Sequence, residues 1–136
     1  MQRILLVDDD TDILEIIQLD LEDDPDNAID TCSSSTKALD FAHDNKYDVI
    51  ITDWRMPDLN GTEFVRTLRE QGCKSSIIIY SGKGMDQDIR EALDCGADYY
   101  LNRRGYPSKE FAELKKIIKG SAGTGAIRNA KKPAPG

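Results

Sequence analysis

Residues 4–10 read ILLVDDD, so four apolar residues are followed directly by three acidic ones. A continuous apolar run of this length is typical of a strand that is buried on both faces, as strands of parallel sheets are. In open α/β sheets, ligands bind at the edge that the carboxyl ends of the strands form. This segment therefore predicts both a buried parallel strand and a polar site at its end.

Strand and helix patterns alternate along the rest of the chain. Further strands are predicted at residues 28–32, 48–52, 77–80 and 99–101, and helices at residues 11–22, 35–45, 61–71, 86–95 and from 107 or 108 onward. On the first helix, the inward face is predicted to hold Ile13, Ile16, Ile17 and Leu21. Strand–helix alternation with short connections predicts an α/β fold, with a doubly wound, five-stranded parallel sheet flanked by five helices.

Glycines mark the ends of two predicted helices. Gly72 suits the left-handed conformation of a helix C-terminus and ends the third helix, and the fourth helix stops at Gly96. The last helix is predicted to direct four apolar side chains inward, namely Phe111, Leu114, Ile117 and Ile118. From residue 120 the apolar periodicity ends. The sequence therefore predicts one domain over residues 1–119 and a flexible tail or linker over residues 120–136.

Composition and charge restrict the classes of function. The chain has 136 residues, of which 39% are hydrophobic and 32% charged, and its net charge is −7. Residues 1–102 hold 23 acidic and 9 basic side chains, whereas residues 103–136 hold 2 acidic and 9 basic ones. Nucleic acid is not expected as a direct partner of the acidic body, because phosphate backbones are bound by clustered Lys and Arg. The basic end suits an acidic partner surface or, more simply, a solvated helix face and tail.

The sequence also predicts a cytoplasmic location without membrane contact. No apolar run approaches the roughly 20 residues that a membrane-spanning helix needs, and no signal-peptide pattern opens the chain. The three cysteines, Cys32, Cys73 and Cys95, lie far apart and lack CxxC spacing. They fit a reducing compartment better than a disulfide framework or a zinc site.

Polar side chains follow four of the predicted strands. Asp8 and Asp9 come after the first strand, Asp53 after the third, Ser81 after the fourth and Arg103 after the fifth. Three clustered carboxylates repel one another unless a cation lies between them, and an oxygen-only ligand set suits Mg²⁺. With that ion, an Asp carboxylate can act as nucleophile toward a phosphoryl donor. Singly, each residue also fits a capping turn or an ordinary strand end, so their joint placement carries the hypothesis.

Four linked motifs resemble those of response-regulator receiver domains from two-component signalling. Residues 4–10 resemble the opening of these domains. Residues 53–57, DWRMP, followed by Gly61, resemble the D-x-x-M-P…G phosphoacceptor loop. Ser81 lies where receivers place a Ser or Thr, and residues 96–101, GADYYL, resemble the G-A-D-x-Y-L segment.

The resemblance extends over residues 2–119 and implies a flavodoxin-like sheet with the strand order 2-1-3-4-5. Residues 106–114 look most like receivers of archaeal signalling proteins that are joined to sensor and kinase modules. The family is a signalling domain rather than an enzyme, and it catalyses only its own phosphorylation and dephosphorylation.

The resemblance also implies a role for each acidic residue of the predicted site. Asp53 would accept a phosphoryl group from a histidine kinase or a phosphotransfer protein. Asp9, Asp53 and the backbone carbonyl of Arg55 would hold Mg²⁺, and Asp8 would act on the ion through water.

Other residues would read out the phosphoryl group. Ser81 and Arg103 would sense it, and Tyr100 would be the switch that moves when it arrives. Three further residues would border the site, namely Lys83, Met56 and Pro57. The output partner or domain, the cognate kinase and the signal are not identified by the sequence. Pairing of two copies through residues 85–119 is an expectation from the resemblance alone.

One departure from the family pattern affects the switch. Receivers usually place Lys-Pro after the last strand, often with a cis peptide bond, whereas this chain has Arg103-Arg104. Without proline a cis bond costs about 2.5–4 kcal/mol, so a trans bond is predicted. Arg keeps the positive charge and can bind phosphate oxygens bidentately, but it is bulkier than Lys. Arg103 in place of Lys therefore bears on the coupling between phosphorylation and the output face.

Two other classes of protein compete with a phosphoacceptor. A phosphorylation-independent pseudo-receiver would keep the fold as an interaction module, and Arg103 is the only residue that favours it. A haloacid-dehalogenase-like phosphatase would use Asp8, not Asp53, as its nucleophile, and it normally needs a cap and a longer chain. A nucleotide-binding P-loop is not supported, because no Gly-rich phosphate loop follows a strand. Without an output domain in these residues, the chain is either a single-domain regulator or the receiver part of a longer protein.

Overall fold

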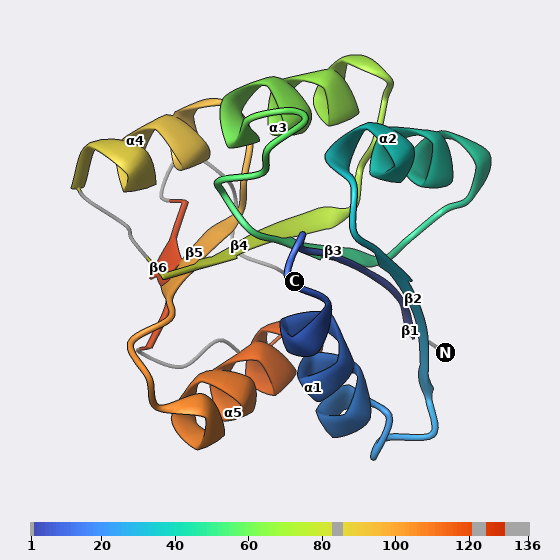
Figure 1. Ribbon diagram of the computed structural model, residues 1–136, viewed down its shortest axis with the longest axis vertical. Coiled ribbons are helices and arrows are strands. Elements are labelled where there is room, and N and C mark those ends of the chain that lie inside the picture. The colour runs from blue at the N-terminus through green and yellow to red at the C-terminus, as the bar shows by residue number, and fades with distance from the viewer. Residues whose placement is uncertain (1, 83–85, 121–124, 130–136) are drawn as a thin grey trace.

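The computed structural model describes residues 2–82, 86–120 and 125–129. Its centre is a six-stranded sheet with the order β2-β1-β3-β4-β5-β6 (Figure 1). The strands are β1 (Gln2–Val7), β2 (Asn27–Cys32), β3 (Val49–Thr52), β4 (Ser76–Ser81), β5 (Tyr99–Asn102) and β6 (Ile127–Arg128). The helices are α1 (Thr11–Leu21), α2 (Ser35–Asp44), α3 (Gly61–Glu70), α4 (Asp86–Asp94) and α5 (Pro107–Ile118).

The predicted parallel sheet is confirmed for the first five strands. β1 pairs in parallel with both β2 and β3, and β4 joins β3 to β5. In the order 2-1-3-4-5, the strand order reverses between β1 and β3. Ligands bind at this point of reversal in folds of this class. The carboxyl ends of these two strands therefore frame the candidate site.

A sixth strand extends the sheet beyond the prediction. β6 pairs antiparallel with β5, so that Tyr100 lies opposite Ile127 and Tyr99 opposite Arg128. These two residues lie in the segment predicted as a tail, and two residues are too few to show an alternating strand pattern. The division into a domain and a flexible tail stays a prediction.

Two helical layers cover the sheet (Figure 1). α1 and α5 pack on one face, and α2, α3 and α4 pack on the other. Successive residues of β1 point into alternate layers, because side chains alternate along a strand: Leu5 and Val7 join the core under α2–α4, while Ile4 and Leu6 join the core under α1 and α5. The ILLV run is thus buried on both faces, as predicted.

The predicted inward face of α1 was partly wrong. Ile16 is 49% exposed, whereas Leu14, which the prediction omitted, is buried together with Ile17 and Leu21. Residues 14, 17 and 21 follow helical spacing, so the centre of the buried face lies about 130° around the helix from Ile16. The inward residues of α5 were correct, since Leu114, Ile117 and Ile118 are buried and Phe111 packs against them.

The helix ends agree with the sequence signals. The Asp10 carboxylate caps α1 by accepting hydrogen bonds from the N–H groups of Asp12 and Ile13. Gly72 and Gly96 follow α3 and α4 with φ of 86° and 127°, values that glycine adopts far more readily than other residues. Across the described ranges, no helix has the length and apolar character that crossing a membrane requires.

Candidate functional site

The three predicted carboxylates come together at the carboxyl ends of β1 and β3. One oxygen from each of Asp8, Asp9 and Asp53 lies within 4.8 Å of the others. The sheet register explains this arrangement, because Val7 pairs with Thr52 and the N–H of Asp53 donates to the carbonyl of Val7 at 3.0 Å. Asp8 is buried, Asp9 is exposed and Asp53 lies between these extremes. The acids are therefore close enough to share one ion that solvent can reach.

Burial perturbs the carboxyl group of Asp8. Desolvation raises its pKa to about 6, and the nearby charge of Asp53 acts in the same direction. The Asp10 N–H, which donates to Asp8 Oδ1 at 2.9 Å, and the charge of Arg103 oppose the rise. The site thus holds a negative charge in a place where burial disfavours it, and a bound cation relieves that cost.

Arg103 forms an ion pair with Asp8. Its Nη2 donates to Asp8 Oδ2 and to the carbonyl of Tyr80, both at 3.0 Å, and the guanidinium stacks on the Tyr80 ring at 4.5 Å. Arg103 Nε is buried and has no hydrogen-bond partner among the described residues. The bond between Arg103 and Arg104 is trans, as predicted, and the described residues contain no cis bond. Arg103 therefore neutralises the charge of Asp8 within the acidic cluster. Its role in sensing the phosphoryl group stays a prediction.

A second hydrogen-bonded group continues from Arg103 to α5. The Tyr80 hydroxyl donates to Glu110 Oε1 at 2.5 Å, and Glu110 Oε2 accepts from the N–H groups of Arg104 and Tyr106. Burial raises the pKa of Glu110, but the hydrogen bonds from Tyr80, Arg104 and Tyr106 outweigh it and lower that pKa. Sequence reasoning missed this group, although an acid in the first turns of a helix that has no capping side chain is a signal for it.

Ser81 and Tyr100 lie side by side inside the fold, on adjacent strands. Both are buried, and the register pairs Ser81 with Asn102 and Ile79 with Tyr100. Burial raises the pKa of Tyr100, and its hydroxyl has no hydrogen-bond partner among the described residues. A buried hydroxyl without a partner is costly. Tyr100 is therefore a buried, unsatisfied polar group near Ser81, and its switch role stays a prediction.

The loop after Asp53 is held close to the site. The Trp54 N–H donates to Asp53 Oδ1 at 2.7 Å, and Trp54 is buried against Gly61, where any added Cβ would clash with the indole ring. Arg55 forms an ion pair with Asp88 of α4 at 3.2 Å. Of the predicted bordering residues, Met56 is buried and Pro57 exposed, while Lys83 lies outside the described residues.

Asp58 anchors the far end of this loop and was not predicted. It accepts hydrogen bonds from Thr36, through both the hydroxyl and the backbone N–H, and from the hydroxyls of Ser34 and Ser35. These bonds hold the pKa of Asp58 well below its usual range. The acid caps α2 from a distant loop, which fixes the loop that carries Asp53.

The donor set fits a hard divalent cation. All three groups offer carboxylate oxygens, and no His or Cys takes part in the cluster. Oxygen-only sites next to a phosphoryl acceptor suit Mg²⁺. The predicted acidic cluster is therefore present, and the role of each of its residues stays a prediction.

Comparison with known proteins agrees with this geometry. Residues 4–118 match the family model of the response regulator receiver domain. The chain is 32% identical over 121 residues to the cell cycle response regulator CtrA of Brucella ovis and of Brucella anthropi, covering 89% of this chain and 52% of each relative. It thus spans about half the length of the curated relatives it matches.

Solved structures agree on the fold. A response regulator receiver domain protein from Clostridium thermocellum is 31% identical, with a TM-score of 0.75 over 88% of this chain and 95% of that one. The chemotaxis response regulator CheY4 of Vibrio cholerae is 26% identical, with a TM-score of 0.76 over 87% and 98%. The chain belongs to the response regulator receiver domain family of two-component systems.

Proposed function

We propose that this receiver domain accepts a phosphoryl group on Asp53 and that Mg²⁺ is bound beside it. The observation that carries the proposal is the gathering of Asp8, Asp9 and Asp53 within 4.8 Å. Such a cluster is unfavourable as it stands, and it becomes favourable when a divalent cation lies between the carboxylates.

The Asp53 carboxylate is placed to act as the nucleophile. Its Oδ1 accepts a hydrogen bond from the Trp54 N–H, which leaves Oδ2 as the oxygen that attacks phosphorus. The new P–O bond forms as the P–N bond to a donor histidine breaks, and the imidazole nitrogen keeps the electron pair. The chain contributes position and charge, because phosphoryl transfer needs little other protein chemistry.

Mg²⁺ would be held by Asp9, Asp53 and the carbonyl of Arg55, with Asp8 acting through water. Bound there, it screens the negative charge on both the carboxylate and the phosphoryl group. Ser81 then supplies a hydroxyl for a phosphoryl oxygen, and Tyr100 responds on the neighbouring strand. Arg103 supplies positive charge to the phosphoryl group, either while paired with Asp8 or after that ion pair has broken.

The phosphoryl donor is a histidine kinase or a phosphotransfer protein, and a cytoplasmic location belongs to the same proposal. The output partner is a further domain or a separate protein. Pairing of two copies through residues 85–119 remains part of the proposal.

The pseudo-receiver alternative has one observation in its favour. Arg103 already neutralises Asp8 at 3.0 Å, so the acidic cluster contains an internal cation. In a pseudo-receiver this ion pair would replace the metal, and partner binding would not depend on Asp53.

Phosphorylation with a small phosphodonor separates the two candidates. The chain is incubated with acetyl phosphate, with and without Mg²⁺, and phosphoryl incorporation is located by peptide mass spectrometry. The proposal expects incorporation on Asp53 that needs Mg²⁺ and disappears in Asp53→Asn, while Asp40→Asn, an exposed position on α2, behaves as native. Absence of incorporation under all conditions would favour the pseudo-receiver, and incorporation that persists in Asp53→Asn but not in Asp8→Asn would favour the phosphatase.

A further inference from the structure

The open edge of β5 is covered by the chain itself. Residues 125–129, here called the strap, add β6 to this edge in antiparallel register, and the N–H of Asn129 continues the pairing by donating to the carbonyl of Asp98 at 2.8 Å. An uncovered edge strand presents N–H and C=O groups that bind other strands. The strap thus occupies a surface that would otherwise accept a strand from another molecule.

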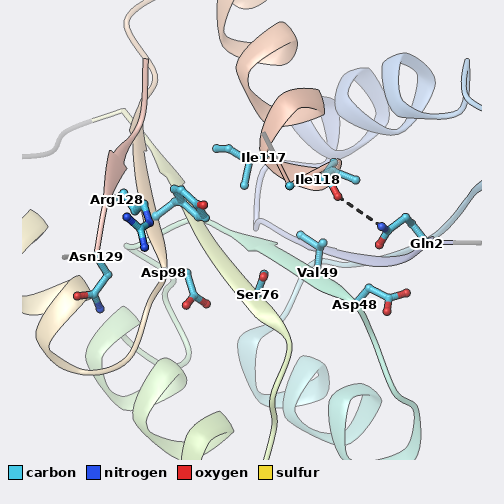
Figure 2. A pocket seen from close by; sticks show the side chains of 11 residues that line it. Gln2, Asp48, Val49, Ser76, Asp98, Ile117, Ile118, Arg128 and Asn129 are labelled. Carbon is cyan, nitrogen blue, oxygen red and sulfur yellow. Dashed lines mark hydrogen bonds between the residues drawn. The ribbon is translucent and has the colours of Figure 1, made fainter. Parts of the chain in front are cut away.

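Asn129 anchors one end of the strap. Its side chain is buried, with 4% exposure, although Ile127 is 43% exposed and Arg128 is exposed as well. Asn129 Nδ2 donates to the carbonyls of Leu93 at 2.9 Å and Ala97 at 2.8 Å. Leu93 lies in the last turn of α4, where carbonyls lack partners within the helix. Figure 2 shows Asn129 just beyond Arg128 at the end of β6, with Asp98 close by.

The other end of the strap lies against α5. A Cβ built on Gly125 would lie 3.2 Å from Cγ of Glu113, so the backbone approaches the helix closely. Ala126 packs against the core under α1 and α5. The strap therefore runs alongside β5, from the side of α5 to the side of α4, as Figure 1 shows for β6.

The strap contains a short strand, and its buried side chain is the polar Asn129. The ladder is two residues long, and its one large apolar side chain, Ile127, is 43% exposed. Short elements with little buried apolar surface open at low free-energy cost. The strap is therefore suited to exchange with a competing strand.

We propose that the edge of β5 is a strand-binding surface whose occupant is the strap, and that it takes an extended peptide with an amide side chain at the position of Asn129. A strand from another molecule pairs there only after the strap has left. The surface includes Tyr100, which pairs with Ile127. The proposal does not depend on phosphorylation of Asp53.

The test uses the full chain and a fluorescent peptide with the sequence of residues 120–132. Asn129→Asp removes both side-chain donors at nearly constant size, and Ile127→Thr is the matched control, since it keeps a β-branched residue at an exposed position. Peptide binding is measured by fluorescence anisotropy. Asn129→Asp is expected to bind the peptide at least tenfold more tightly than the native chain or Ile127→Thr, because its own strap competes less. A peptide that carries the same Asp is expected to bind at least tenfold more weakly.

Amide hydrogen exchange gives a second readout that does not need the peptide. In the native chain the amide of residue 129 is expected to be protected, and in Asn129→Asp it is expected to exchange at least tenfold faster. Equal peptide affinity in all three chains, or an unprotected amide at residue 129 in the native chain, would overturn the proposal.

Discussion

Buried polar groups are hydrogen-bonded differently at the two ends of the strands, here called the carboxyl edge and the amino edge of the sheet. At the carboxyl edge, the buried Asp8 has a raised pKa, and Tyr100 Oη and Arg103 Nε are buried without a hydrogen-bond partner among the described residues. At the amino edge, part of which Figure 2 shows, buried polar groups are bound to one another. The difference lies in hydrogen bonding rather than in burial.

Arg69 illustrates the amino edge. Its guanidinium donates to the carbonyls of Gly96, Cys73 and Ser75 and to the carboxylate of Asp98. Asp98 in turn accepts from the N–H of Ile77 at 2.8 Å. This network ties α3 to the segments that enter β4 and β5. Proteins place strained or unsatisfied groups at functional sites and satisfy them elsewhere. The hydrogen-bonded amino edge therefore stabilises the fold, and the carboxyl edge holds the candidate site.

The largest expected effect comes from breaking the amino edge. Arg69→Ala removes donors from three carbonyls and from a partly buried carboxylate, and it is expected to lower the free energy of unfolding by about 3–4 kcal/mol. Arg66→Ala, one turn away and exposed, is the matched control with an expected change below about 0.5 kcal/mol. Urea unfolding measures both values. A loss below about 1 kcal/mol in Arg69→Ala would show that the network is not a main source of stability.

Gly61→Ala perturbs the contact between Gly61 and Trp54, which holds the loop after Asp53 at the carboxyl edge. The new methyl group would overlap the Trp54 ring, so the expected loss is about 2–3 kcal/mol, with a red shift of the tryptophan emission as the indole is displaced. Thr62→Ala, at the next position of the same helix, serves as control. An unshifted emission spectrum in Gly61→Ala would mean that the indole does not pack on this glycine.

Asp8→Asn removes a buried negative charge from the carboxyl edge. The folded-state pKa of about 6 lies above the ordinary value of 3.8, so the folded chain holds this proton more tightly than the unfolded chain. The stability that the proton supplies is fully present below about pH 4 and is lost as pH rises through about 6. Asp8→Asn is therefore expected to be more stable than native by about 2 kcal/mol at pH 8 without Mg²⁺, and about equal at pH 4. Thermal unfolding at both pH values checks this, and a constant difference would contradict the assignment.

Tyr80→Phe tests the hydrogen-bonded group that joins β4 to α5 at the carboxyl edge. The change removes the hydroxyl that Glu110 accepts, and it is expected to cost about 1 kcal/mol. Tyr106→Phe is the control. It removes an exposed hydroxyl at the start of α5, the helix that carries Glu110, and should leave stability unchanged. Chemical denaturation that shows equal midpoints for all three chains would remove Tyr80 from the account.

Most of the fold was readable from the sequence because its signals are local. The ILLV run and the similar runs of β3 and β4 are buried on both faces, which is what continuous apolar strands in parallel sheets require. The acidic site was readable for a related reason, since residues that follow neighbouring parallel strands meet at one edge. The error at Ile16 arose because an apolar side chain on a helix need not be buried.

The rest depends on pairs that lie far apart in the chain. Asp8 and Arg103 are 95 residues apart, and Tyr80 and Glu110 are 30 apart. Which partner such a side chain selects depends on rotamers and on the final packing, neither of which leaves a periodic pattern. The strap has the same problem, because a two-residue strand and one buried Asn carry no signal of their own.

Binding of Mg²⁺ to the chain, measured by isothermal titration calorimetry, tests the central claim most directly. The claim is that Asp9 and Asp53 share one divalent ion at the carboxyl edge. It predicts one site in the native chain, loss of binding in Asp9→Asn and in Asp53→Asn, and native affinity in Asp98→Asn at the other edge. A native chain that binds no Mg²⁺, or the two carboxyl-edge variants binding it as tightly as native, would contradict it.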